Sequence, residues 1–366
     1  MKATERLHER GQSLWLDNIT RRMLDSGELA RSVARYSLTG LTSNPSIFDL
    51  AIASGDYDAE IRDKAGRGIR GEQLFFDLAI EDLRRAADLF LPIHERTDGV
   101  DGWVSLEVSP LLAHDAQATI AAARSLWERA ARPNLMIKVP GTNEGRIAIE
   151  ESIAAGIPIN VTLLFSKEQY LGAVEAFLRG IERRIVAQQG PRVGSVASVF
   201  VSRWDKAVNA RAPAGLKDRL GLAIGADVYR AYRRVMDSER WQRLANAGAR
   251  MQRLLFASTG TKDPASPDTL YVRGLAAPFT VDTMPDKTLA AFADHGEVGA
   301  LLPADGGDCD AVFARFADAW IDLAALASRL QEDGARAFAD SWRELLGRVE
   351  QQANRQTRGG REEQRS

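Results

Sequence analysis

Lys138 lies inside an apolar run, NLMIKVPGT at residues 134–142, where a charged side chain needs a reason. Lysine is rarely buried unless it is paired or has a chemical task. With the two-residue alternation of a β-strand, Lys138 shares a face with Met136, and the adjacent isoleucine and valine occupy the other face. A desolvated amine that gives up its proton can attack a carbonyl carbon, which makes Lys138 a candidate Schiff-base nucleophile. The alternative is a lysine that faces solvent at the end of a strand.

Two carboxylates, Asp17 and Glu107, end other apolar segments and could carry protons for such a reaction. Loss of water from a carbinolamine and cleavage of a C–C bond both need a positioned acid or base. Glu107 stands between two apolar residues in WVSLEVS, and burying it unpaired would cost on the order of several kcal/mol. Asp17 precedes NITRRML and could instead be the N-cap of a helix.

These side chains need elements that bring them together, and the chain alternates short apolar segments with longer helical ones. One helical segment opens with SKEQ, in which Ser166 is followed three residues later by Gln169, as in a capping box. Strand–helix alternation predicts a parallel sheet. The predicted strands are LWLDNI (14–19), SLTGLTSNPS (37–46), GWVSLEVSP (102–110), NLMIKVPGT (134–142), IPINVTLLFS (157–166), SVASVFVSR (195–203), RLLFAST (253–259) and TLYVRGLA (269–276).

Eight strand candidates favour a closed (β/α)8 TIM barrel with additional peripheral helices. An open doubly wound sheet is the main alternative, but no G-x-G-x-x-G turn follows the first strand. In a barrel, Lys138 points inward and functional residues gather at the carboxyl ends of the strands. The polar residues at those ends are Asp17, Thr42 with Asn44, Glu107, Lys138, Asn160 with Thr162, Ser198 with Arg203, and Ser258 with Lys262.

Composition excludes several other classes of protein. The net charge is −2 and the pI about 6.2, so no overall field favours nucleic acid or an acidic membrane. The single cysteine, Cys309, excludes an intrachain disulfide and a multi-cysteine metal site, and the four histidines show no ligand spacing. We therefore expect neither metal nor cofactor. The N-terminal segment is charged and has no long apolar run, so we expect neither a signal peptide nor a membrane anchor. We therefore predict a cytoplasmic protein.

The domain organisation is predicted to be simple. Neither an internal repeat nor a low-complexity linker indicates a second domain, so residues 1–355 are expected to form one domain. Residues from about 305 onward are expected to be helices on the exterior of the barrel, and 356–366 a frayed polar tail. The oligomeric state is left open between a monomer and a small homo-oligomer.

The motifs together resemble those of transaldolase, and the spacing resembles the longer bacterial branch of that family. They are WLDNITR (15–21), GLTSNPSIF (40–48), IKVPGTNEG (137–145), INVTLLFS (159–166) and VFVSRWD (199–205). The resemblance implies a class I aldolase-type barrel that needs no metal or organic cofactor. It further implies transfer of a dihydroxyacetone unit from sedoheptulose 7-phosphate to glyceraldehyde 3-phosphate. The products are erythrose 4-phosphate and fructose 6-phosphate, in the non-oxidative pentose phosphate pathway.

The same resemblance assigns roles to the residues of this chain. Lys138 matches the Schiff-base lysine and Asp17 the general acid/base of C–C cleavage. Glu107 and Thr162 match the pair that positions a catalytic water. The residues that match substrate-binding positions are Thr42, Asn44 and Asn160 for the donor hydroxyls, and Ser198, Phe200 and Arg203 for the pocket rim and the phosphate. Arginine suits a phosphate because its planar fork donates hydrogen bonds in pairs.

One stretch departs from the family pattern. Many transaldolases carry a second phosphate-binding arginine just after a serine, whereas ASTGTKDP (257–264) keeps Ser258 and has Gly260 near that position. Lys262 is the expected substitute cation. The segment AAPFTVDTMPDKTL (276–289) resembles the eighth strand and loop of this branch, and no catalytic role is assigned to it.

Two alternatives to transfer remain. An enzyme like fructose-6-phosphate aldolase would use the same lysine but release free dihydroxyacetone. That group is shorter and typically carries glutamine where this chain has Glu107, so Glu107 favours transfer. A non-catalytic barrel that binds sugar phosphates would be expected to lack the lysine or a carboxylate, and all three are present.

Overall fold

Eight parallel strands close into a barrel in chain order, from β1 next to β2 round to β8 next to β1. The computed structural model describes residues 1–363, and the side chains of residues 1–355. The strands are β1 Ser13–Asp17, β2 Leu38–Thr42, β3 Trp103–Glu107, β4 Leu135–Pro140, β5 Ile159–Leu164, β6 Ser195–Phe200, β7 Arg253–Ala257 and β8 Val281–Met284. The predicted (β/α)8 barrel is confirmed, and seven of its strands lie where the sequence placed them.

The eighth strand was placed wrongly by the pattern of apolar runs and correctly by the family resemblance, whose segment 276–289 contains β8. Residues 269–276 contain a short helix, α13 Leu270–Gly274, and the strand that closes the barrel is β8, seven residues further on. A short apolar run cannot be told from a helical segment by its composition. The real strand carries Asp282 and Thr283 in its middle, so it is the less apolar of the two segments.

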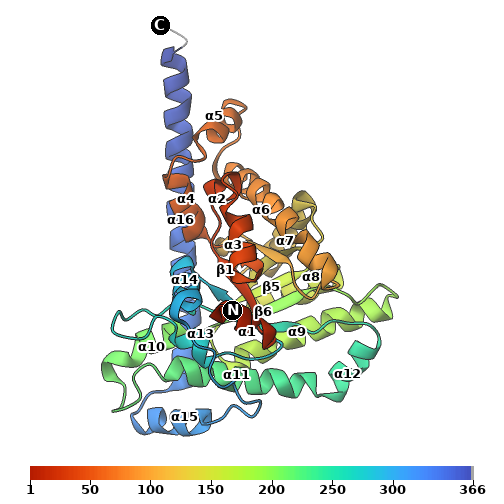
Figure 1. Cartoon of the computed structure of the whole chain (residues 1–366). Helices are drawn as coiled ribbons and strands as arrows, with labels where there is room; N and C mark the ends of the chain where they lie inside the picture. Colours follow the sequence, from red (N-terminus) through yellow and green to blue (C-terminus); the bar gives the residue numbers. More distant parts are fainter. Residues whose placement is uncertain (364–366) are drawn as a thin grey trace.

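Helices surround the barrel (Figure 1). They are α1 Ala3–Glu9, α2 Arg21–Asp25, α3 Glu28–Tyr36, α4 Pro45–Ala53, α5 Asp58–Gly66, α6 Gly71–Arg96, α7 Ala116–Ala130, α8 Asn143–Ala154, α9 Lys167–Val186, α10 Ser202–Val208, α11 Leu220–Met236, α12 Glu239–Asn246, α13, α14 Asp286–His295, α15 Cys309–Asp318 and α16 Leu323–Glu363, with 3-10 turns at Pro110–Leu112 and Asn209–Arg211. The predicted cap of α9 is confirmed, since the Ser166 hydroxyl accepts a hydrogen bond from the Gln169 amide at 3.3 Å. None of the helices in the described part of the chain is long and apolar enough to cross a membrane.

The barrel interior is filled below its mouth. Trp15 on β1 is fully buried, and its indole N–H donates to Asp101 Oδ1 at 2.9 Å. Its neighbour on β2 is Gly40, where a Cβ would lie 2.5 Å from the indole ring. The absence of a side chain at Gly40 therefore makes room for Trp15, whose bulk closes the floor beneath Asp17 two residues further along β1.

The longest helix, α16, has 41 residues and runs beside α4 and α5 (Figure 1). Trp342 on this helix is 1% exposed and meets the Phe75 ring of α6 edge-to-face at 5.0 Å. Of the predicted frayed tail, residues 356–363 continue α16, and 364–366 lie outside the described residues. The single domain over residues 1–355 stays a prediction.

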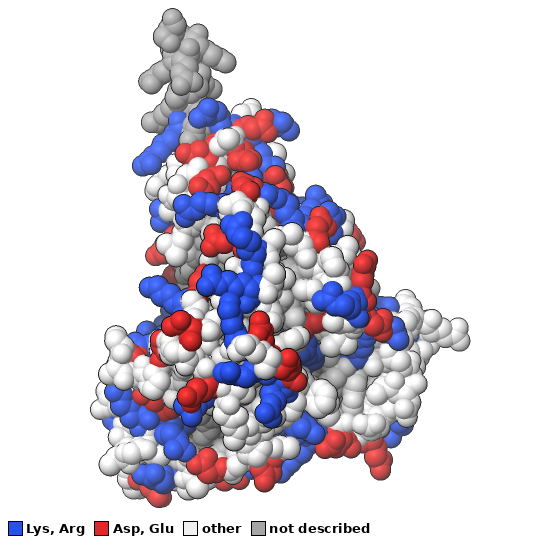
Figure 2. Space-filling model, viewed as in Figure 1, with Lys and Arg blue, Asp and Glu red and all other residues white. Residues whose placement is uncertain are grey.

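Charge is mixed on the face of the molecule shown in Figure 2, where Lys and Arg alternate with Asp and Glu over most elements. This face presents no broad surface of one sign that would attract a polyanion.

Candidate active site

A cavity of about 240 Å³ opens at the carboxyl ends of the strands and contains ten of the twelve predicted site residues. The lining residues are Asp17, Thr42, Asn44, Ser46, Lys138, Thr162, Ser198, Phe200, Arg203, Ala257, Ser258, Lys262, Thr283, Pro285 and Phe338. The other two predicted residues, Glu107 and Asn160, lie behind the cavity wall and contact lining residues.

Lys138 points into the barrel and is 5% exposed. Its Nζ lies 3.2 Å from Glu107 Oε2 and donates to the Ser43 carbonyl oxygen at 3.2 Å. The pairing of β3 with β4 sets Glu107 directly beside Lys138. The interpretation of Lys138 as a solvent-facing lysine is therefore wrong, because the amine is buried at the mouth and paired with a carboxylate.

Glu107 is buried, and burial raises the pKa of its carboxyl although the charge of Lys138 opposes that shift. The Thr162 hydroxyl is a buried side-chain oxygen without a hydrogen-bond partner among the described residues, whereas Glu107 Oε2 has its ion pair with Lys138. Buried polar atoms are normally satisfied, often by an ordered water. The Thr162 hydroxyl and the Glu107 carboxyl, on either side of Lys138 along the sheet, suit a water molecule that serves imine formation.

Asp17 stands on the opposite side of the cavity, at the end of β1. Burial raises the pKa of its carboxyl, while Lys138 and the Thr42 hydroxyl oppose the shift. Thr42 donates to Asp17 Oδ1 at 2.8 Å, and its oxygen lies 2.7 Å from the Thr283 hydroxyl. Asn44 precedes Pro45, and an Asn-Pro pair is often a structural signal in a loop. In the structure Asn44 caps α4 by accepting a hydrogen bond from the Ile47 amide at 3.1 Å, and it also lines the cavity.

A chain of hydrogen bonds stiffens the wall between β3 and β6. The Ser198 hydroxyl donates to Asn160 Oδ1 at 2.7 Å, and Asn160 Nδ2 donates to the Ser105 hydroxyl at 3.0 Å. Asn160 is fully buried, so the cavity surface here is formed by Ser198.

Two cations lie at the rim of the cavity, Arg203 at the start of α10 and Lys262 after β7. Burial lowers the pKa of Arg203, whose guanidinium lies 5.1 Å from the Phe200 ring. Lys262 is exposed by area, yet loss of water around its amine and the charges of Arg203 and Lys206 lower its pKa. Nearby, Ser258 adopts a left-handed φ of 57°, and its hydroxyl lies 2.9 Å from that of Ser202. A cluster of positive charges of this kind attracts anions.

Sequence reasoning missed two informative lining residues. Thr283 lies on β8, inside the segment that resembles the eighth strand and loop of the family, but no role in the site was assigned to that segment. Phe338 reaches the cavity from α16, with its ring centroid 5.6 Å from Lys138 Nζ. Nothing in the sequence around Phe338 indicates this, because the contact depends on where α16 crosses the barrel.

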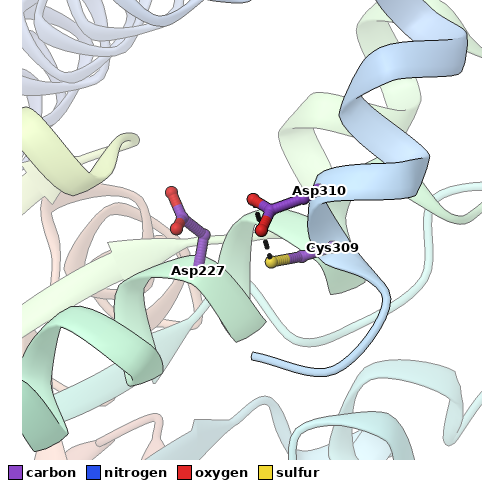
Figure 3. A group of neighbouring side chains, drawn as sticks. All are labelled: Asp227, Cys309 and Asp310. Carbon is purple, nitrogen blue, oxygen red and sulfur yellow. Dashed lines mark hydrogen bonds between the residues drawn. The ribbon is translucent and has the colours of Figure 1, made fainter. Parts of the chain in front are cut away.

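A separate cluster lies away from the cavity, where Asp227 on α11 meets Cys309 and Asp310 at the start of α15 (Figure 3). Their donor atoms lie within 4.8 Å of one another, as in a metal site. Arg230 nevertheless binds both carboxylates, with Nη1 2.6 Å from Asp310, and Lys167 Nζ lies 3.0 Å from Asp227. Two cations already neutralise the carboxylates, so we interpret the cluster as an ion-pair network that joins α11 to α15.

A closed parallel barrel with a buried lysine and two carboxylates at its mouth defines the Schiff-base aldolase class of architecture. A family model described as transaldolase/fructose-6-phosphate aldolase matches residues 14–349, and the chain belongs to this family. It is 46% identical to the transaldolase of Thermobifida fusca, over 95% of this chain and 97% of that protein. It is 43% identical to those of Frankia alni and Mycobacterium bovis, over 94% and 92% of this chain and 96% and 93% of those proteins. The predicted resemblance, enzyme class and transaldolase activity are confirmed.

Proposed function

We propose that Lys138 carries a dihydroxyacetone unit from a ketose phosphate to an aldose phosphate as a Schiff base, with Asp17 and Glu107 as its proton carriers. The observation that supports this most strongly is the buried amine of Lys138, 5% exposed and facing a cavity that both carboxylates adjoin. Donor and acceptor are sedoheptulose 7-phosphate and glyceraldehyde 3-phosphate, and the reaction takes place in the cytoplasm.

The first step joins donor and enzyme. The neutral Lys138 amine attacks the C2 carbonyl carbon of the donor, and the carbinolamine loses one water to give an imine. The Glu107 carboxyl and the Thr162 hydroxyl hold that water, and Glu107 shuttles its protons. The raised pKa of Glu107 suits this role, because the carboxyl takes up and gives back a proton near neutral pH more readily than an ordinary glutamate.

The second step breaks and remakes a carbon–carbon bond. Asp17 takes the proton of the C4 hydroxyl, the C3–C4 bond breaks, and its electron pair moves into the protonated imine to form an enamine. The shortened aldose phosphate leaves. The enamine carbon then attacks the aldehyde carbon of the acceptor, and Asp17 returns its proton to the new hydroxyl. Water hydrolyses the imine, which frees the product and Lys138. The Thr42 hydroxyl holds Asp17 in position through its 2.8 Å hydrogen bond.

The phosphate groups of both substrates bind at the rim. Arg203 offers paired donors and Lys262 a point charge, and both line the same cavity as Lys138. The substrate's phosphate dianion relieves the mutual repulsion of Arg203 and Lys262, which strengthens substrate binding. It also fixes how deep in the cavity the substrate's carbonyl group lies. Ser258 adds a hydroxyl beside this path, and Ser198, whose proton goes to Asn160, adds an acceptor oxygen.

Borohydride reduction with fructose 6-phosphate tests the nucleophile. The expected result is a three-carbon adduct on Lys138, located by peptide mass spectrometry as a secondary amine. Lys262→Met is the matched control, because it removes the other lysine of the cavity and must leave the adduct in place. An adduct on Lys262, or none on Lys138 in the wild-type protein, would exclude the proposed mechanism.

A further inference from the structure

The helix α16 contributes one side chain, Phe338, to the active-site cavity. The centroid of its ring lies 5.6 Å from Lys138 Nζ and 5.8 Å from Arg203 Cζ. It also meets the Phe200 ring at 6.4 Å and an interplanar angle of 65°. Phe338 therefore covers the space between the amine that would hold the donor carbon and the cation that would hold its phosphate.

The helix is held over the mouth from both sides of Phe338. Two turns before it, Gln331 Nε2 donates to the Leu163 carbonyl oxygen at 2.9 Å, which ties α16 to the end of β5. Just after it, the Ser46 hydroxyl donates to Ser341 at 3.1 Å, and Trp342 is 1% exposed. The Phe338 ring is thus fixed by the packing of the helix and is not a mobile surface group.

The helix backbone also comes close to the phosphate rim. At Gly334, one turn before Phe338, a Cβ would lie 3.1 Å from both Arg203 Nη1 and Leu163 Cδ2. The small residue lets α16 lie close enough for Phe338 to contact Phe200 and Arg203 together.

An enamine on Lys138 has two possible fates, and this inference rests on the proposed function. Attack on the acceptor aldehyde gives transfer. Alternatively the enamine carbon, C3, takes a proton from water, which restores the iminium at C2, and water then adds to C2. The C2–N bond then breaks, so that one water is consumed overall and free dihydroxyacetone leaves. The second route needs solvent at the enamine carbon, and an apolar cover over a closed site excludes solvent.

We propose that Phe338 is a specificity-determining residue, which covers the enamine and thereby favours transfer over release of dihydroxyacetone. The ring places an apolar face on the solvent side of Lys138, while the polar groups that serve the imine water, Glu107 and Thr162, lie on the barrel side. Water needed for imine chemistry and water that would protonate the carbon therefore approach from different directions.

The test compares Phe338→Leu and Phe338→Ala with the wild-type protein. Dihydroxyacetone release from fructose 6-phosphate without acceptor is divided by transfer with erythrose 4-phosphate as acceptor. We expect this ratio to rise in the order wild type, Leu, Ala, by about tenfold in total, because each step removes apolar cover. Leu346→Ala, at a half-buried position further along α16 and off the cavity, is the matched control and must leave the ratio unchanged.

A second measurement does not depend on how well the Ala variant folds. In deuterated water, protonation of the enamine carbon puts one deuterium on the released dihydroxyacetone, and Phe338→Leu is expected to form more of this deuterated product than wild type. The inference is overturned if folded Phe338→Ala leaves the ratio of release to transfer unchanged. It is also overturned if Phe338→Leu forms no more deuterated dihydroxyacetone than wild type. A wild-type protein without the Lys138 adduct would instead overturn the proposed function, so the two failures are distinguishable.

Discussion

Asp282 on β8 is fully buried beside the active-site strands. Since Thr283 faces the cavity, Asp282 faces the surrounding helices. The Thr259 hydroxyl donates to Asp282 Oδ1 at 3.0 Å and also lies 3.0 Å from the Thr283 carbonyl oxygen, so its one proton is shared between two acceptors. A shared hydrogen bond from one neutral hydroxyl is a weak substitute for the water that an ionised carboxylate loses on burial.

The second carboxyl oxygen, Asp282 Oδ2, is buried without a hydrogen-bond partner in the part of the chain that the structure describes, so an ionised carboxylate there would be poorly stabilised. Burial raises the pKa of Asp282 to about 8, while the Thr259 hydrogen bond opposes the shift. Thr259 follows Ser258 directly, so the same bridge holds the end of β7 where it joins the cavity.

The pKa of Asp282 predicts how the free energy of unfolding depends on pH. Below pH ~4 the carboxyl is protonated in both states and contributes no pH dependence. Between pH ~4 and the folded pKa of about 8, unfolding releases a proton, so stability falls as pH rises. The slope from this group approaches about 1.4 kcal/mol per pH unit, and its sum by pH 7 is at most on the order of 4 kcal/mol.

Asp282→Asn removes this loss, because the amide oxygen can accept the Thr259 hydrogen bond and the amide does not titrate. We expect the variant to match the wild type near pH 5 and to exceed it progressively up to pH 8. The midpoint of urea unfolding is measured at each pH. Asp340→Asn, which replaces an exposed carboxylate on α16, is the control variant. A stability difference between Asp282→Asn and wild type that stays constant with pH, or a variant that is less stable at pH 8, would refute the raised pKa of Asp282.

The remaining predictions concern catalysis. Asp17→Ala and Glu107→Ala should each lower kcat by about 10²-fold or more in a coupled transfer assay, and loss at Glu107 alone should slow formation of the borohydride adduct. Wild-type activity at either carboxylate variant would contradict its role. Arg203→Ala should raise KM for phosphorylated sugars and leave unphosphorylated ones unaffected, so equal effects on both would exclude a phosphate contact. Lys262→Gln should do the same by a smaller factor, and the effect should shrink in high salt, as expected for a point charge at an exposed site.

Much of the site could be predicted from sequence because the apolar runs of a parallel barrel show where its strands end. Lys138, Glu107 and Asp17 each lie near the end of such a run, and parallel pairing brings these ends to one mouth regardless of the loop conformations. The apolar pattern missed β8 for the converse reason, although the family resemblance indicated its segment. Its buried Asp282 makes it look polar, and only the tertiary contact with Thr259 explains how a carboxyl is accommodated there.

Phe338 could not have been predicted from periodicity. A phenylalanine at helical spacing in α16 indicates a buried face and does not say which surface that face meets. The answer depends on the path of the helix, which is set by contacts such as Gln331 with the Leu163 carbonyl and the packing of Trp342. These partners lie more than a hundred residues away in the chain.

The replacement of the family's second arginine has a steric explanation. Gly260 occupies the expected position, and a Cβ there would lie 3.1 Å from the Thr288 hydroxyl oxygen on α14 and 3.7 Å from Pro285. A side chain at this site would require the Thr288 hydroxyl to give way, whereas Lys262 reaches the same cavity from two residues further along. Burial and the charges of Arg203 and Lys206 lower the pKa of its amine, so the free protein bears an electrostatic cost that a bound phosphate dianion would remove. We expect this relief of repulsion to recover part of the affinity that one point charge lacks relative to an arginine fork.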